Sequence, residues 1–241
     1  MISGNFDEHA ALVALLRAQP DGLTWPAIAA ELLEAGSAVE VWARHAPPPA
    51  LIELPDEITP DSVAEDLRAW RAHGYRLLSI LDDDYPVRLR GVQQAPPAIF
   101  TLGSVVADDP AVSVIGSREA SAVGLAMAAA LARALTARHM TVVSGLARGI
   151  DTAAHRAALD TGGRTVAVIG SGIGRVYPAE NRGLQNEIAS RGLVLSQFWP
   201  DAPARKHTFL MRNATMSGYG LAVSQSGPAP AASGAACSRV M

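Results

Sequence analysis

Apolar residues recur at helical spacing over the first part of the chain. They are spaced for amphipathic helices that break at Pro20 and Gly36: Leu12, Leu15, Leu16, Ile28, Leu32, Leu33, Val39 and Trp42. Thr24 is a good helix start, because Pro26 then falls where a first-turn N–H needs no partner. We therefore predict a helical accessory domain over residues 1–72, with a proline-rich connector at about 45–60.

Short apolar runs alternate with turns and helical segments over residues 73–223. The expected strands are 75–80, 96–100, 112–115, 141–143, 165–169 and 193–195, and the expected helices are 121–137, 151–159 and 181–190. Strands that are apolar on both sides need helices on both faces. The pattern predicts an α/β fold with a doubly wound, Rossmann-like, mostly parallel sheet and a ligand at the strands' carboxyl ends. Residues 224–241 are of low complexity, and we expect a disordered tail.

The composition of the chain argues against several classes of protein. The chain has 241 residues, 49% of them hydrophobic, without a run of about 18 apolar residues or a basic leader at its start. We expect a cytoplasmic protein with no membrane partner.

Cys237 is the single cysteine, which excludes disulfides and a cysteine zinc site. Three adjacent acids, Asp82 to Asp84, are interpreted as a solvated turn rather than a metal site, so no metal is expected.

Charge is distributed unevenly along the chain. Residues 1–110 carry 17 acids against 7 basic residues, whereas residues 111–241 carry 6 acids against 13. The second half is therefore the candidate anion binder. Between Arg164 and Arg212, seven cations are interleaved with four aromatic residues: Tyr177, Phe198, Trp199 and Phe209. Cations and stacking faces together are typical of single-strand binding, although a core role for Phe198 and Trp199 stays open.

Three glycine turns each end a predicted strand and open a helix. They are Gly116-Ser117-Arg118, residues 144–149 with Gly145 and Gly149, and residues 170–174 with Gly170 and Gly172. Backbone N–H groups and positive helix ends would converge there on one crevice, which favours phosphate. Arg118 could make a bidentate contact with a phosphate or stack on a base, or it could donate to a neighbouring backbone carbonyl.

The sequence supports an enzymatic role for these turns less well than it supports anion binding. The dinucleotide fingerprint is not met and the P-loop lysine is absent. Ser144, Asp151 and His155 could suggest nucleophilic catalysis. However, Asp151 and His155 stand four residues apart on one predicted helix, and we interpret them as a structural helix-start pair with Asp151 as the N-cap. No cofactor and no catalytic residue are expected.

The turns belong to a longer ordered series of motifs: residues 114–118, 144–151 with Ala154-His155, 163–178 with Asn181, and 209–213. In this order and spacing they resemble the DNA-processing protein A (DprA, or Smf) family. The second motif, residues 144–151 with Ala154-His155, is highly specific for that family. Upstream, Tyr85-Pro86, Leu89, Pro96-Pro97 and Gly103 are similar to that family's entry into its Rossmann-like domain. The resemblance covers about residues 10–223.

The resemblance implies a protein without catalysis that binds single-stranded DNA, protects it during natural transformation and helps load the recombinase RecA. It also implies a homodimer. The expected DNA-binding residues, with Lys206 included for its charge alone, are Gly116, Ser117, Arg118, Ser144, Gly145, Arg148, Gly149, Gly170, Gly172, Lys206, Arg212 and Asn213.

The sequence departs from the family pattern at several places. Arg-Asn-Arg reads Arg212-Asn213-Ala214, and Ser-Glu reads Ser196-Gln197. After Val223, where the family has parts used for dimerisation and RecA contact, the low-complexity stretch is what a truncation or frameshift would give. Two alternatives therefore stay open. One is a nucleotide-binding or nucleotide-hydrolysing Rossmann-like protein, although the Pro-Gly-Gly-x-Gly-Thr-x-x-Glu run of the cytokinin-activating phosphoribohydrolases is missing. The other is an inactive, truncated family member.

Overall fold

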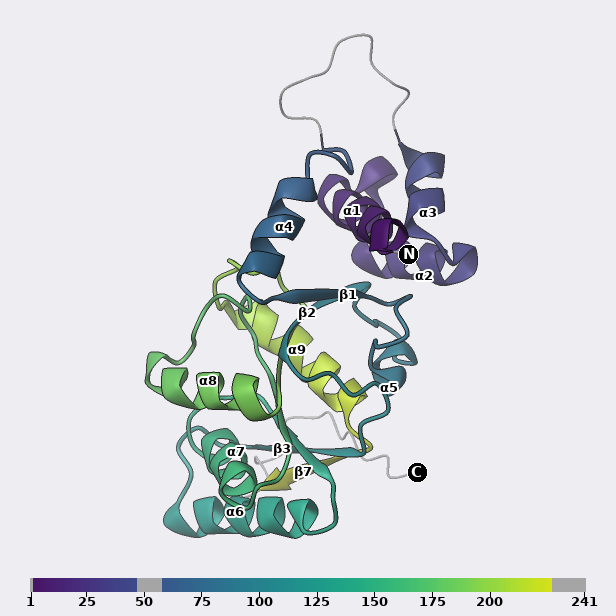
Figure 1. The fold of residues 1–241 in the computed structure, drawn as a ribbon. Coiled ribbons are helices and arrows are strands. Elements are labelled where there is room, and N and C mark those ends of the chain that lie inside the picture. The colour runs from purple at the N-terminus through teal and green to yellow at the C-terminus, as the bar shows by residue number, and fades with distance from the viewer. Residues whose placement is uncertain (1, 47–57, 227–241) are drawn as a thin grey trace.

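Seven strands form one sheet in the order β1-β2-β6-β5-β4-β3-β7 (Figure 1). The computed structural model describes residues 2–46 and 58–226. The strands are β1 (Arg76–Ser79), β2 (Ala98–Gly103), β3 (Ala111–Gly116), β4 (Thr141–Ser144), β5 (Thr165–Val168), β6 (Leu193–Ser196) and β7 (Ala222–Ser226). Strands β3 to β7 pair in parallel, and β1 and β2 add an antiparallel edge next to β6. The predicted doubly wound, mostly parallel Rossmann-like sheet is confirmed.

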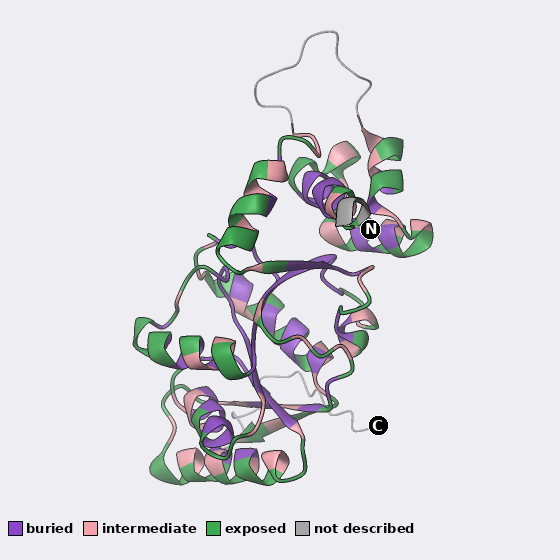
Figure 2. Ribbon diagram, in the orientation of Figure 1, coloured by how far each residue is buried: buried purple, intermediate pink, exposed green. Residues whose placement is uncertain are grey.

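Helices connect the strands and cover both faces of the sheet. They are α1 (Ile2–Ala18), α2 (Trp25–Ala35), α3 (Ala38–His45), α4 (Ala64–Ala72), α5 (Val87–Arg90), α6 (Ala122–Thr136), α7 (Ile150–Asp160), α8 (Arg182–Arg191) and α9 (Lys206–Tyr219), with short 3₁₀ turns η1 (Pro20–Gly22) and η2 (Ala179–Asn181). Helices α6, α7 and α8 pack side by side, whereas α9 packs with α5 (Figure 1). Every residue of the central strands β4, β5 and β6 is buried, which explains why these strands are mostly apolar (Figure 2).

Strand direction determines where a ligand can bind. The chain runs from β3 through β4 and β5 to β6, and then returns over α9 to β7 on the other side of β3. Because these strands are parallel, the turns after β3, β4 and β5 all lie at one edge of the sheet. Open α/β sheets bind their ligands at this kind of switch point, outside the carboxyl ends of the strands.

The amino-terminal helices pack on the β1–β2 side of the sheet through aromatic residues. Trp199 lies 5.7 Å from Trp25 and 5.9 Å from Trp70 between ring centroids, and the Arg17 guanidinium lies 5.3 Å from the Trp199 ring. Phe198 is buried as well. The role left open for these two aromatic residues is therefore settled: both belong to the core and not to the crevice.

The strand β7 corrects the expected start of the tail. It pairs with β3 as far as Ser226, so residues 224–226 belong to the sheet. The remaining tail, 227–241, and most of the expected connector, 47–57, lie outside the described residues. No helix in the described part of the chain is long and apolar enough to cross a membrane. Two of the three adjacent acids have partners: Asp82 is hydrogen bonded to His9 at 2.9 Å, and Asp84 forms an ion pair with Arg76.

Candidate functional site

A cavity of about 430 Å³ opens where the turns after β3, β4 and β5 meet. Its lining includes Arg118 from the first turn, Gly145 and Arg148 from the second, Gly170 from the third, and two aromatic residues, Tyr177 and Phe209. The predicted convergence of three turns on one crevice is thus present. A single nucleotide is small enough for a cavity of this volume.

The first turn presents a cation on an aromatic face. Gly116 is the last residue of β3, and Ser117 and Arg118 after it are exposed. The Ser117 hydroxyl accepts the N–H of Glu119 at 3.1 Å, which tightens the turn. The Arg118 guanidinium lies 5.1 Å from the centroid of the Phe209 ring. That contact is a favourable cation–π geometry, so the exposed Arg118 side chain has a partner at the cavity that it lines.

The second turn approaches the first so closely that only glycine fits between them. Gly149 has a φ of 73°, and a Cβ there would collide with the carbonyl oxygen of Ser117. That same carbonyl accepts the N–H of Ile150 at 3.2 Å, which binds the two turns together. Gly149 therefore shapes the crevice rather than presenting a side chain to a ligand.

Asp151 has a different role from the predicted one. The N-cap of α7 is Gly149, and Asp151 lies inside the first turn of the helix. Its Oδ2 accepts the N–H groups of Gly145, at 3.1 Å, and Ala147, at 3.2 Å, so it organises the loop before the helix. Burial raises the pKa of Asp151, against the lowering effects of Arg212 and of these N–H groups. The N-cap assignment was wrong, because the loop folds back over the helix start and brings its own donors to the carboxylate.

Two residues of the possible catalytic set, Ser144 and His155, do not line the crevice. Ser144 is fully buried and donates to the carbonyl of Val114 at 2.6 Å. His155 is fully buried too, and its Nδ1 lies 2.7 Å from the hydroxyl of Thr165. Burial and the charge of Arg212 lower the pKa of His155 to about 3, which keeps the ring neutral. Ser144 therefore supports the turn from behind, and its side chain does not reach a ligand.

Arg212 is buried, whereas the sequence placed it at the crevice edge. Only 5% of it is exposed, and its Nη1 donates to the carbonyl of Val168 at 3.1 Å. Arg118, Asn213 and Arg212 all line a second hollow of about 310 Å³. Asn213 is exposed, so it remains available to a ligand there. Arg212 supports the second turn by packing against Gly145, and it also forms part of the wall of the second hollow.

The third turn contributes less than its glycines suggest. Gly170 lines the cavity, where a Cβ would lie 2.7 Å from the Phe209 ring. Gly172 instead packs against the carbonyls of Trp199 and Pro200, and its N–H donates to Ala202 at 2.8 Å. Its amide is therefore already used within the protein. Lys206 is exposed at the start of α9, one turn before Phe209, and does not line either cavity.

Two acids at this site were not anticipated. Glu119 and Glu180 both line the larger cavity, and Glu180 forms an ion pair with Arg148. The position of Glu180, two residues after Tyr177-Pro178, was the only hint in the sequence. The cations between Arg164 and Arg212 do not all form one basic surface. Arg164 is paired with Asp109, and Arg191 is paired with Glu187.

The chain resembles known proteins along most of its length. Residues 76–238 match the family model described as DNA recombination-mediator protein A. The DNA processing protein DprA of Streptococcus pneumoniae is 43% identical over 141 residues, 58% of this chain and 50% of that protein. A putative DNA processing protein DprA of Mycobacterium tuberculosis is 39% identical over 167 residues, 64% of this chain and 43% of that protein. The chain thus spans about half the length of these relatives.

Solved structures agree with the fold. The X-ray structure of DNA processing protein A from Streptococcus pneumoniae matches with a TM-score of 0.66 and 31% identity, over 91% of this chain and 77% of that one. DNA processing protein A from Helicobacter pylori, whose structure concerns its single-stranded DNA binding mode, matches with a TM-score of 0.55 and 26% identity, over 63% of this chain and 68% of that one.

Proposed function

The chain belongs to the DNA recombination-mediator protein A family, and from this premise we propose that it binds single-stranded DNA in the crevice above β3, β4 and β5. Binding would proceed without catalysis: phosphates lie on the guanidinium groups, and bases stack on the aromatic rings. Such a site has little sequence preference, because every base has a face to stack.

One observation carries the proposal: Arg118 lies 5.1 Å from the Phe209 ring, at the mouth of a cavity that Tyr177 also lines. The ring centroids of Tyr177 and Phe209 are 5.6 Å apart and tilted by 50°, so two aromatic faces border the same space. A nucleotide needs both a cation for its phosphate and a flat apolar face for its base. The crevice provides the two within one cavity.

The turns provide further electrostatic support. Helices α6 and α7 begin directly after the first and second turns, so their positive ends face the same edge of the sheet. The similarity to the Helicobacter pylori protein supports the choice of single-stranded DNA over a mononucleotide.

The binding step is tested by titrating a labelled oligothymidylate with the protein in fluorescence anisotropy at several salt concentrations. We expect saturable binding that weakens as salt rises, because phosphate contacts release counterions. Absence of binding at low salt would refute the proposal. Binding of a mononucleotide panel with no binding of the oligonucleotide would instead favour the nucleotide-binding alternative, and thermal shift distinguishes these ligands.

In the cell, we propose that the chain protects incoming single-stranded DNA during natural transformation and helps load RecA. Family membership supports this step, and the crevice supports only its DNA-binding part. The measurement is the rate at which RecA assembles on DNA coated with single-strand binding protein, with and without this chain. An unchanged rate at saturating protein would limit the role to DNA binding and protection.

A further inference from the structure

Arg148 and Glu180, which both line the larger cavity, form an ion pair. Arg148 follows β4 on the second turn, and Glu180 lies on η2, 32 residues further along the chain. Both side chains are partly exposed, 65% for Arg148 and 50% for Glu180. The hydrogen bond between them raises the pKa of Arg148 and lowers that of Glu180, so both groups stay charged at neutral pH. The guanidinium therefore already holds an anion in this structure.

Hydrogen bonds of the buried Asn181 side chain and of Thr152 join the segments that carry Arg148 and Glu180. The Asn181 side chain, which is buried, donates to the carbonyl of Leu146 at 2.9 Å and to the hydroxyl of Thr152 at 3.0 Å. Thr152 in turn donates to the carbonyl of Ala147 at 2.7 Å. The segment that carries Glu180 is thus tied to the turn that carries Arg148. The backbone arrangement therefore positions Arg148 and Glu180 to form their ion pair.

The charges around the cavity sum to a neutral site. Its charged lining residues are two arginines, Arg118 and Arg148, and two acids, Glu119 and Glu180. A strand that places a phosphate on Arg148 has to displace the carboxylate that occupies this guanidinium. Exposed ion pairs contribute little net free energy, so the exchange is readily reversible.

We propose that Glu180 is an internal competitor for the DNA phosphate at Arg148, and that it sets the affinity of the crevice. This inference rests on the proposed function, since it assumes that the crevice binds single-stranded DNA. Glu180 then lowers the affinity below what the turns alone would give. Its removal should strengthen binding, which is the opposite of what the loss of a structural residue does.

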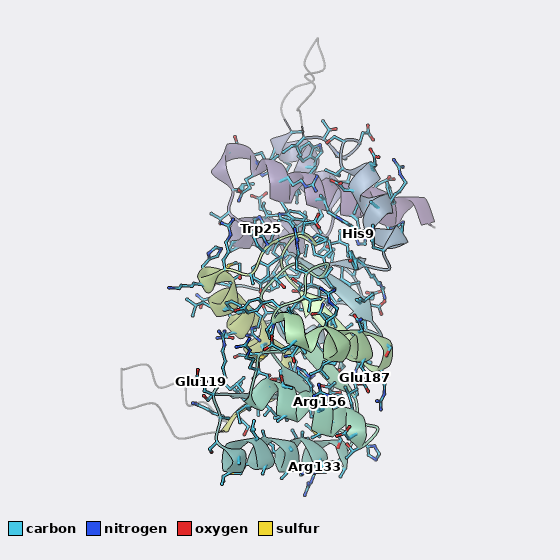
Figure 3. All side chains as sticks on the ribbon, turned by 90° about the vertical axis from the view of Figure 1, so that its left-hand side faces the viewer. His9, Trp25, Glu119, Arg133, Arg156 and Glu187 are labelled. Atoms are coloured by element: carbon cyan, nitrogen blue, oxygen red, sulfur yellow. The ribbon has the colours of Figure 1, made fainter. Side chains whose placement is uncertain are left out.

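The test compares Glu180→Gln with Glu187→Gln in anisotropy titrations with a labelled oligothymidylate. Glu187 also pairs with an arginine, Arg191, at similar exposure, and its loss changes the net charge equally. Figure 3 shows Glu187 on the opposite side of the view from Glu119, which lines the cavity. We expect Glu180→Gln to bind about two- to fivefold tighter than the wild type at low salt, and Glu187→Gln to bind about as the wild type does. Equal affinities of the two variants would overturn the proposal.

A second comparison asks whether the gain acts through Arg148. Arg148→Ala should bind more weakly, and its slope of log affinity against log salt should be shallower by about 0.7, the value for one phosphate on a single strand. Adding Glu180→Gln to Arg148→Ala should give no further gain, because no guanidinium remains to be released. An equal gain in the presence and absence of Arg148 would show a general charge effect and contradict the proposal.

The same data separate this inference from the proposed function. If neither the wild type nor any variant binds the oligonucleotide, the proposed function fails. If the wild type binds and Glu180→Gln does not bind more tightly, only the competitor role fails. Melting temperatures of all variants, compared with the wild type, show that each is folded, and Glu180→Ala should reproduce the gain of Glu180→Gln.

Discussion

The guanidinium of Arg212 lies directly against the backbone of Gly145, so closely that a Cβ on this glycine would collide with Nη1. Arg212 is held in place by the carbonyl of Val168, 3.1 Å away. Burial lowers the pKa of Arg212, and the charge of Asp151 acts in the opposite direction. A buried cation thus lies beneath the second turn of the crevice. This contact adds to the hydrogen bonds from Gly145 and Ala147 to Asp151 that shape the turn.

Gly145→Ala should therefore damage both folding and binding. The new methyl group has to displace a buried guanidinium, and overpacking of this kind costs about 1 to 3 kcal/mol. We expect a loss of that size in urea unfolding and weaker DNA binding. Gly183→Ala is the matched control, because a Cβ there meets nothing within 4 Å. If both alanine variants are equally stable, the contact with Arg212 does not support the turn.

Arg118→Ala should weaken the binding of single-stranded DNA and make it less sensitive to salt. The variant loses a phosphate contact, so the slope of log affinity against log salt should become shallower by about 0.7. Arg133→Ala serves as the control, since Arg133 lies in the last turn of α6 and lines neither cavity of the crevice. An unchanged slope for Arg118→Ala would mean that this arginine does not contact phosphate.

Phe209→Ala should weaken binding without altering the salt dependence. An aromatic ring that stacks on a base contributes roughly 1 to 3 kcal/mol, but it neutralises no phosphate. Anisotropy titrations at several salt concentrations separate the two effects. Phe209→Tyr keeps the ring and should retain most of the affinity. A changed slope for Phe209→Ala would indicate that the ring acts mainly by holding Arg118, from which it is 5.1 Å away.

His155 should make the fold less stable in mild acid. Its pKa in the folded chain is about 3, below the ordinary value of 6.5, because the ring is fully buried. As the pH falls below 6.5, the unfolded chain binds a proton that the folded chain excludes until about pH 3, so stability decreases over this window. At 1.36 kcal/mol per pH unit, the loss between pH 6.5 and pH 5 is about 2 kcal/mol.

The pH effect is measured by urea unfolding of the wild type and of His155→Asn at both pH values. The Thr165 hydroxyl donates to Val142, so the ring's Nδ1 must be the donor to Thr165, and an asparagine amide can replace that donor. His155→Asn should be less stable than the wild type at pH 6.5, with a smaller loss on going to pH 5. Parallel losses in the two proteins would show that His155 is not the group responsible.

Much of this fold could be predicted from local pattern. Runs such as Val142-Val143 and residues 165–168 are apolar on both faces because their strands are buried on both faces, and the pattern shows this without any partner. The order of strands and turns along the chain then determines which turns meet at one edge. The end of the sheet domain was predicted too early, at residue 223, since Ser224 to Ser226 are polar and join the sheet by pairing with β3.

The sequence by itself determined the doubly wound sheet, the three turns and the residues Arg118, Tyr177 and Phe209 that could serve a nucleic acid, because apolar period and glycine position are local properties. Only the tertiary structure decided which charges are available. It buried Arg212, directed Asp151 to the amides of the loop, and paired Arg148 with Glu180 across 32 residues. The reason is physical: the state of a charged group depends on its solvent exposure and on neighbours from distant segments, and neither is written in the spacing of residues along the chain.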